Sequence, residues 1–216
     1  FLEKKRCPIY KIASPEITDI PLIEKVAKTK KPLFISTGLA EKSDIDLAIK
    51  TIKKWNKNIV LMKCTSAYPA PLKELNLKTM QDYEKRYDVR CGFSDHSISA
   101  TASTTAVALG ARVIEKHIML DKIKSVDNFF SLNIKKFSDT VKKIRDTELI
   151  LGKVDYRITK NSKKNLNGRR SLYYVKDIEK NHIIKHEHIK SIRPSFGEHP
   201  RFLNLFLGKK IKKNVK

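Results

Sequence analysis

Short apolar runs recur along the first part of the chain at intervals of about 25 residues, the repeat expected of alternating strands and helices. The runs lie at residues 10–13, 33–35, 59–62, 89–93 and 113–114. Strand, helix and strand at this spacing predict βαβ units whose strands pair in parallel. The pattern therefore indicates the α/β class.

Apolar residues spaced three or four positions apart predict a helix in each interval and another after the last run, at about residues 20–27, 45–52, 77–83, 98–109 and 135–151. Ser43 or Asp44 suits the N-cap of the second helix, and Gly152 ends the last one. Five strands in a row fit either part of an eight-stranded barrel or a doubly wound sheet. No glycine-rich phosphate loop follows any strand, which counts against a dinucleotide-binding fold.

The chain changes character after Gly152. Residues 153–168 are polar and are predicted to form a linker. A short strand is expected at 171–175, and the remainder of the chain leans towards β-structure. The predicted organisation is an α/β domain over residues 1–152, the linker, and a small β-rich domain over residues 169–216.

Hydroxyl or ionisable residues follow every one of the five apolar runs. In chain order they are Ser14 and Glu16; Ser36, Thr37 and Gly38; Thr65, Ser66 and Tyr68; Ser94, Asp95 and His96; and Glu115, Lys116 and His117. Barrel enzymes build their active sites from such groups at the carboxyl ends of parallel strands. Ordinary turn chemistry would place them at some strand ends rather than at all five, so the pattern favours a site.

His96 and His117 follow neighbouring predicted strands, which lie about 4.8 Å apart in a sheet, so two imidazoles there can share one cation. A structural, hydrogen-bonded role for each histidine is equally open on spacing alone. His186 and His188 alternate along another predicted strand, but that segment is rich in lysine, and we expect surface residues there.

Four further residues at the strand ends could surround an anion, because an ammonium group supplies charge and hydroxyl groups donate hydrogen bonds to phosphate oxygens. They are Lys11, Ser14, Ser36 and Ser94. Residues 36–38 (STG) are expected to open a helix, whose N-terminus also favours anions. Serine at a strand end is equally ordinary capping chemistry, so this signal is weak by itself.

Composition narrows the functional classes. The formal net charge of +23 admits a nucleic-acid or anionic-membrane partner, but lysine is scattered along the chain, so we favour solvated faces. Three cysteines are too few for a disulfide framework and fit a reducing, cytoplasmic compartment. The sequence contains no membrane-length apolar stretch and no signal-peptide pattern. It begins with Phe1, which suggests an incomplete chain.

Taken together, the motifs resemble the sialic acid synthase (NeuB-like) family. The matching segments are 10–14 (YKIAS), 35–38 (ISTG), 63–71 (KCTSAYPAP), 92–96 (GFSDH) and 113–117 (VIEKH). Residues 170–173 (RSLY) and 192–194 (IRP) resemble the start of the family's antifreeze-like (SAF) domain. Residues 14–23 and 63–66 are most similar to the pseudaminic acid synthase branch, with sialic or legionaminic acid synthases as the runner-up.

The resemblance implies a partial (β/α)8 barrel and a transferase that condenses phosphoenolpyruvate with a 2,4-diacetamido-2,4,6-trideoxy hexose and water, releasing a nonulosonic acid and phosphate. It implies a divalent metal (Mn²⁺, Mg²⁺ or Co²⁺) on His96 and His117, and a homodimer. The other implied roles are catalysis by Glu115 and Tyr68, phosphoenolpyruvate binding by Lys11, Ser14, Ser36, Ser66 and Ser94, and sugar binding by Tyr68, Asp127 and Arg170.

The sequence departs from the family's pattern in two loops. Residues 123–127 (IKSVD) stand where the family has a glycine-rich turn, and Asn181 stands where glycine is usual, so the turn at Asn181 is expected to need a positive φ. We expect the family's first three strands and the end of its SAF domain to be missing from this chain. We therefore expect this polypeptide alone to be inactive and, with open sheet edges, prone to aggregation. A basic nucleic-acid-binding protein and a non-catalytic remnant are the alternatives from other classes.

Overall fold

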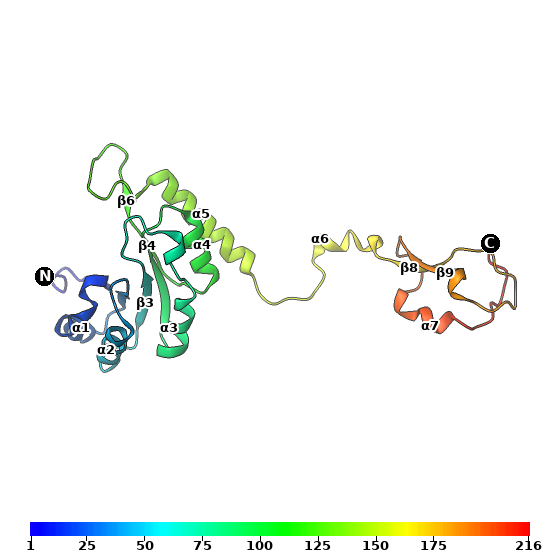
Figure 1. The fold of residues 1–216 in the computed structure, drawn as a ribbon, viewed down its shortest axis with the longest axis horizontal. Coiled ribbons are helices and arrows are strands. Elements are labelled where there is room, and N and C mark those ends of the chain that lie inside the picture. Colours follow the sequence, from blue (N-terminus) through cyan, green and yellow to red (C-terminus); the bar gives the residue numbers. More distant parts are fainter. The chain divides into compact units, whose positions relative to one another are not determined.

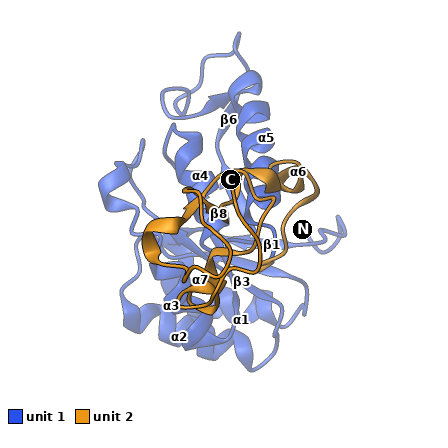
Figure 2. Cartoon of the chain, turned by 90° about the vertical axis from the view of Figure 1, so that its right-hand side faces the viewer, with its two compact units in different colours: residues 1–153 blue, residues 154–216 orange.

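The computed structural model describes residues 1–216, which divide into two compact units of residues 1–153 and 154–216 (Figure 2). The first unit contains a five-stranded parallel sheet in which the strands stand in chain order (Figure 1). The strands are β1 (Tyr10–Ile12), β2 (Leu33–Ser36), β3 (Ile59–Cys64), β4 (Arg90–Asp95) and β5 (Ile114–Lys116). A doubly wound sheet reverses its strand order at one point, whereas consecutive order is that of a (β/α) barrel.

Helices follow each strand of this sheet. They are α1 (Ile20–Ala27), α2 (Lys42–Lys53), α3 (Thr79–Tyr87), α4 (Ala100–Ala108) and α5 (Ile134–Leu151), with short 3-10 helices η1 (Ser14–Thr18) and η2 (Leu72–Glu74) in two of the loops. A second small parallel pair, β6 (Ile118–Met119) and β7 (Leu132–Asn133), precedes α5. None of the helices combines the length and apolar character needed to span a membrane.

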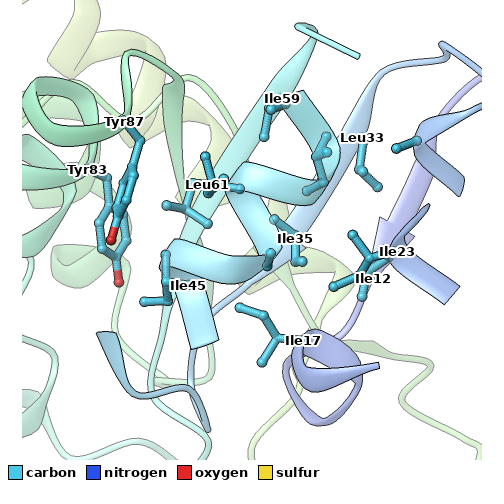
Figure 3. Close-up of a cluster of buried hydrophobic side chains, with 14 of the residues drawn as sticks. Ile12, Ile17, Ile23, Leu33, Ile35, Ile45, Ile59, Leu61, Tyr83 and Tyr87 are labelled. Atoms are coloured by element: carbon cyan, nitrogen blue, oxygen red, sulfur yellow. The ribbon is translucent and has the colours of Figure 1, made fainter. Parts of the chain in front are cut away.

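The core lies between the sheet and its helices. Alternate residues of β1, β2 and β3 meet α1 and α2 in one apolar cluster, in which Leu33, Ile35 and Leu61 are fully buried (Figure 3). Cys91 and Phe93 of β4 meet α3 and α4 in a second cluster. Since side chains alternate between the two faces of a strand, the residues between these positions lie on the opposite face of the sheet.

Local signals set the helix ends, although not always where the sequence suggests. Asp19 caps α1 by accepting a hydrogen bond from the amide of Leu22 at 3.0 Å, and α5 ends at Gly152, whose φ is +48°. The N-cap of α2 is Glu41, which forms a capping box with Asp44, so the expected cap at Ser43 or Asp44 is wrong. The amide of Glu41 donates to Oδ2 of Asp44 at 2.9 Å, so Asp44 acts from inside the first turn rather than as the cap.

The second unit is built around an antiparallel pair, β8 (Ser171–Tyr174) and β9 (Ile189–Ile192). Ile178, Ile184, Ile189 and Ile211 form its apolar core. Its short helices are α6 (Lys160–Lys163), η3 (Leu166–Gly168), η4 (His186–His188), η5 (Pro200–Phe202) and α7 (Leu203–Phe206), of which α6 and η3 fall within the expected linker. Asn181 has a φ of +69°, as its place in a glycine-type turn predicts.

Burial predicts which positions on one helix matter for stability. Ile52 of α2 is fully buried, so we expect Ile52→Ala to lower the free energy of unfolding by about 2–5 kcal/mol, because it opens a cavity in the core. Leu47 on the same helix is half exposed, and Leu47→Ala should change stability by no more than about 0.5 kcal/mol. Urea unfolding followed by circular dichroism measures both, and equal losses would contradict this account of the core.

Candidate active site

The carboxyl ends of the five strands align in register on the face of the sheet opposite the helices. Cys64 pairs with Ser94, and Ser94 pairs with Glu115. Lys11 and Ser36 lie on the same face by alternation along β1 and β2. Of the strand-end groups expected from the sequence, Lys11, Ser36, Ser94 and Glu115 are therefore brought to one side of this edge, the position of active sites in barrel enzymes, whereas Asp95 and Lys116 face α4 on the helix side.

A lysine, a serine and a glutamate form the charged centre of this edge. Both the Lys11 ammonium at 2.9 Å and the Ser94 hydroxyl at 2.6 Å donate to Oε2 of Glu115. Burial by itself would raise the pKa of Glu115, but the hydrogen bonds from Ser94 and Lys11 outweigh it and hold the pKa below its usual range. Glu115 is therefore an ionised carboxylate at neutral pH, and its second oxygen, Oε1, makes neither of these bonds.

Two serine side chains approach the backbone of Gly38. The hydroxyl of Ser14 accepts a hydrogen bond from the amide of Leu39 at 2.7 Å. Gly38 lies against the hydroxyls of Ser14 and Ser66, and a Cβ atom at Gly38 would stand only 3.1 Å from Ser14 Oγ and would collide with Ser66. Ser14, Ser66 and Gly38 thus share one small space, which only glycine leaves open.

Ser36 is the unusual member of the group. Its hydroxyl oxygen is buried and has no hydrogen-bond partner in the structure. Leaving a buried hydroxyl unpaired costs about 1–3 kcal/mol, so native proteins rarely keep one without a reason. We give the name anion pocket to Lys11, Ser14, Ser36, Ser66 and Ser94, the residues expected from the sequence to bind an anion, since one ammonium and four hydroxyl groups can donate hydrogen bonds.

The two histidines predicted to meet do lie together. Their ring centroids are 5.3 Å apart, and the rings are inclined by 72°. Nδ1 of His96 lies 2.9 Å from the carbonyl oxygen of Thr65, which can only accept, so Nδ1 carries the proton and Nε2 keeps a free lone pair. Nδ1 of His117 lies 3.4 Å from a carboxylate oxygen of Asp127. Both rings therefore engage Nδ1 and leave Nε2 for a ligand.

This donor set fits a divalent cation. Metal-bound histidines usually give their other ring nitrogen to a carbonyl or carboxylate, which is the arrangement of His96 and His117. No group of three or more His, Cys, Asp or Glu side chains in the structure is arranged to hold a metal, so the protein ligands would be the two imidazoles. Oxygen ligands from water or substrate would complete such a shell for Mn²⁺ or Co²⁺.

Aromatic rings wall the site next to the histidines. The ring of Tyr68 lies 4.4 Å from that of His96 and 4.9 Å from that of Phe130, and Phe130 lies 4.7 Å from His117. Desolvation among these groups, helped by nearby acidic groups, raises the pKa of the Tyr68 hydroxyl. Tyr68 thus keeps its proton at neutral pH and can donate it in a hydrogen bond.

Several residues singled out from the sequence lie elsewhere. Arg170 belongs to the second unit, where its guanidinium donates to the carbonyl of Ser191 at 2.6 Å and so links β8 to β9. Residues His186–His188 form the turn η4 rather than a strand, so the expectation of alternating histidines is wrong, and His188 accepts from the amide of Lys185. The helix expected to open at residues 36–38 is also wrong, because α2 begins only at Lys42.

The structure adds groups that the sequence did not single out. Phe130 comes from a loop without periodic pattern, and the carbonyl of Thr65 is a backbone group that residue identity does not reveal. Lys63 is partly buried, donates to the Cys64 carbonyl at 2.7 Å, and has a pKa lowered by burial. Lys63 is the first residue of the KCTS segment (residues 63–66), and that was the available signal.

Comparison with family models gives two matches. The NeuB family model matches residues 1–156, and the SAF domain model matches residues 169–216. Both families were expected from the strand-end motifs and from the tail, and both expectations are confirmed. Because the first match spans well over half of the chain, it decides the family.

Individual proteins agree with the family models. The chain is 42% identical to pseudaminic acid synthase of Campylobacter jejuni, over 100% of this chain and 63% of that protein. It is 38% identical to N,N'-diacetyllegionaminic acid synthase of Campylobacter jejuni, over 96% of this chain and 64% of that protein. The chain thus spans less than two thirds of the length of these relatives.

A solved structure supports the fold. The spore coat polysaccharide biosynthesis protein spsE of Bacillus subtilis aligns with 99% of this chain and 66% of its own chain, with a TM-score of 0.67 and 31% identity. The expected partial (β/α)8 barrel followed by a small β-rich domain is therefore confirmed.

The lowered pKa of Glu115 predicts how acid affects the site. A carboxylate whose pKa falls on folding contributes stability that is present above its unfolded pKa and is lost as the pH falls through the folded value. We therefore expect wild-type protein to lose more stability than Glu115→Gln as the pH drops from 6 to below the ordinary glutamate value of 4.5. Urea unfolding at a series of pH values measures the difference, with Asp121→Asn, an exposed carboxylate, as control. Parallel curves for wild type and Glu115→Gln would contradict the assignment.

Proposed function

Since this chain belongs to the NeuB family and carries a SAF domain, we propose that the intact protein condenses phosphoenolpyruvate with an amino sugar and water. The acceptor would be a 2,4-diacetamido-2,4,6-trideoxy hexose, and the products pseudaminic acid and phosphate. The observation that carries this proposal is the placement of two imidazoles with free Nε2 atoms on the same sheet edge as the anion pocket. A condensing synthase needs both a place for phosphoenolpyruvate and a group that activates an aldehyde.

The anion pocket is proposed to bind phosphoenolpyruvate. Lys11 would pair with its phosphate or carboxylate, and the hydroxyls of Ser14 and Ser66 would donate to its oxygens. Ser94 would join them by turning its single proton from Glu115 to the anion. Ser36 gives the strongest support, because an anion would provide the partner that its buried hydroxyl lacks. Gly38 keeps the space between these hydroxyls open.

His96 and His117 are proposed to hold the divalent cation, Mn²⁺, Mg²⁺ or Co²⁺. When bound, such a cation polarises an aldehyde oxygen as a Lewis acid. Thr65 and Asp127 would keep both rings oriented through their Nδ1 atoms. Tyr68 would present its hydroxyl, still protonated, to the sugar that lies over the same rings.

Glu115 is proposed to take the proton of the attacking water. In the overall reaction the C=C bond of phosphoenolpyruvate opens and its methylene carbon bonds to the aldehyde carbon, whose oxygen takes up a proton and becomes a hydroxyl group. The water oxygen bonds to the adjacent enol carbon and loses its protons as that carbon becomes a ketone. The bond from that carbon to the phosphate oxygen then breaks, and phosphate leaves. Oε2 of Glu115 is occupied by Lys11 and Ser94, which leaves Oε1 as the acceptor for the proton.

Specificity for the sugar is the finer part of the proposal. The identity of 42% to a pseudaminic acid synthase exceeds the 38% to a legionaminic acid synthase, which favours the first. Legionaminic or sialic acid synthesis is the alternative. We also propose sugar contacts by Asp127 and Arg170, a homodimer, and a cytoplasmic location. A salt-dependent shift of generic DNA that His96→Ala leaves unchanged would instead favour the nucleic-acid-binding alternative.

Substitution of Ser36 should affect folding stability and phosphoenolpyruvate binding in different ways. Ser36→Ala removes an unpaired buried hydroxyl, so we expect unfolding stability to be unchanged or slightly higher. The same change should weaken phosphoenolpyruvate binding about tenfold, because a hydrogen bond to a charged group is worth about 1.5–3 kcal/mol. Calorimetric titration of the chain with phosphoenolpyruvate measures the affinity, and Ser99→Ala, at the cap of α4, serves as control. Equal affinities for wild type and Ser36→Ala would contradict the assignment.

Phosphate release tests the whole proposal. The chain spans 63% of the Campylobacter synthase, so we would join it to the part of that protein that it does not match and assay the fusion with phosphoenolpyruvate, the sugar and Mn²⁺. The fusion should turn over, and the isolated 216 residues should not. His96→Ala should lower the rate at least about a hundredfold, whereas His182→Ala in the second unit should leave it nearly unchanged.

Three results would count against parts of this proposal. Undiminished turnover by the His96→Ala fusion would remove the histidine from the site. Turnover by the isolated chain would refute its expected inactivity. A fusion that releases phosphate only with the legionaminic acid precursor would move the specificity to the alternative.

A further inference from the structure

A buried ion pair lies directly beside the two histidines in the chain. Nζ of Lys116 is 3.0 Å from Oδ2 of Asp95, and their side chains are 2% and 0% exposed. The two residues face each other across β4 and β5 in the strand register. The mechanism proposed above uses neither of them.

Every part of this pair is hydrogen-bonded. The hydroxyl of Ser103 in α4 donates to Oδ2 of Asp95 at 2.6 Å, and the amide of Ser97 donates to Oδ1 at 2.8 Å. The ammonium of Lys116 also donates to the carbonyl of Ser97. The pair therefore ties together β4, β5, α4 and the loop that follows β4.

Burying such an ion pair costs free energy of desolvation, which suggests a role other than stability. Two charges lose their hydration when they are buried, and an apolar pair of the same volume is often as stable or more stable. Buried ion pairs are better attested as devices that fix a register or a single arrangement. Here the arrangement that is fixed includes His96 and His117, because each directly follows one member of the pair.

Because side chains alternate along β4 and β5, the ion pair can fix the positions of the two histidine rings. Asp95 and Lys116 lie on the helix side of the sheet with Phe93 and Ile114, while His96 and His117 are the next residues and meet over the other side. A slip or a splaying of β4 against β5 would separate the rings. The pair is the last side-chain link between the two strands before the rings.

We propose that Asp95 and Lys116 are positioning residues that hold the His96 and His117 rings at the separation a shared divalent cation requires. The inference rests on the proposed function, since it concerns the same two imidazoles. It assigns to the pair a part in cation affinity rather than in overall stability. The ligand is a divalent cation of the Mn²⁺ type, and the pair itself does not contact it.

The test removes both charges together. In the full chain, Asp95→Asn/Lys116→Met leaves no unpaired buried charge, so we expect the protein to stay folded by circular dichroism. Affinity for Mn²⁺, measured by electron paramagnetic resonance, should fall about 10–100-fold, the usual effect of losing a partner that orients a metal ligand. Asp139→Asn/Lys143→Met on α5, a matched but exposed pair, should leave the affinity unchanged.

A second readout needs no metal. In wild-type protein the Nδ1 proton of His96, held by the Thr65 carbonyl, should give a slowly exchanging ring signal in ¹⁵N-edited NMR spectra. In the double variant this signal should broaden or disappear, whereas a purely structural pair would leave it in place as long as the protein stays folded. The α5 control should keep it.

The outcomes are distinct. A folded double variant with Mn²⁺ affinity within threefold of wild type and an unchanged ring signal would overturn the positioning role. The proposed function fails if wild-type protein does not bind Mn²⁺, or if His96→Ala leaves its Mn²⁺ binding unchanged. In either case the ring signal alone decides whether the pair positions the rings. Should the double variant unfold, Ser103→Ala, which removes one bond to Asp95 and no charge, takes its place with a smaller loss expected in both readouts.

Discussion

The parallel register of β4 against β5 is the constraint on which the site depends. It sets Ser94 opposite Glu115 on one face of the sheet and Asp95 opposite Lys116 on the other. Because side chains alternate with a period of two, a slip of β5 by one residue would carry Glu115 to the helix side and Lys116 to the opposite face, and each would lose its partner on β4. The contacts of Glu115, the facing of the two histidines and the buried network all follow from this single pairing.

Much of this architecture can be predicted from the sequence, because burial dictates which positions are apolar. Strands covered by helices must be apolar where they meet those helices, so the runs that include Leu33, Leu61 and Phe93 reveal β2, β3 and β4. Parallel strands then end at one edge, which is enough to predict that His96 and His117 lie together. Helix starts were less predictable: α2 is capped by Glu41, which is not among the usual capping residues, and the side chain of Asp44 accepts from the Glu41 amide.

The remainder of the site depends on groups that no sequence pattern predicts. The orientation of His96 comes from the carbonyl of Thr65, which every residue possesses. Phe130 reaches the rings from an irregular loop, where no periodicity predicts direction. The lack of a partner for Ser36 is a property of its surroundings and not of its side chain. Features of this kind appear only when distant segments are assembled.

Gly38 gives the anion pocket a property that none of its side chains supplies. The space between Ser14, Cys64 and Ser66 is open because Gly38 has no Cβ atom. A Cβ atom at this position would stand 2.9 Å from the sulfur of Cys64. Every longer side chain would intrude further, so no graded series of substitutions can tune the pocket at this position. Residue 38 therefore has only two states for the anion pocket: glycine leaves the space open, and even alanine, the smallest alternative, fills it.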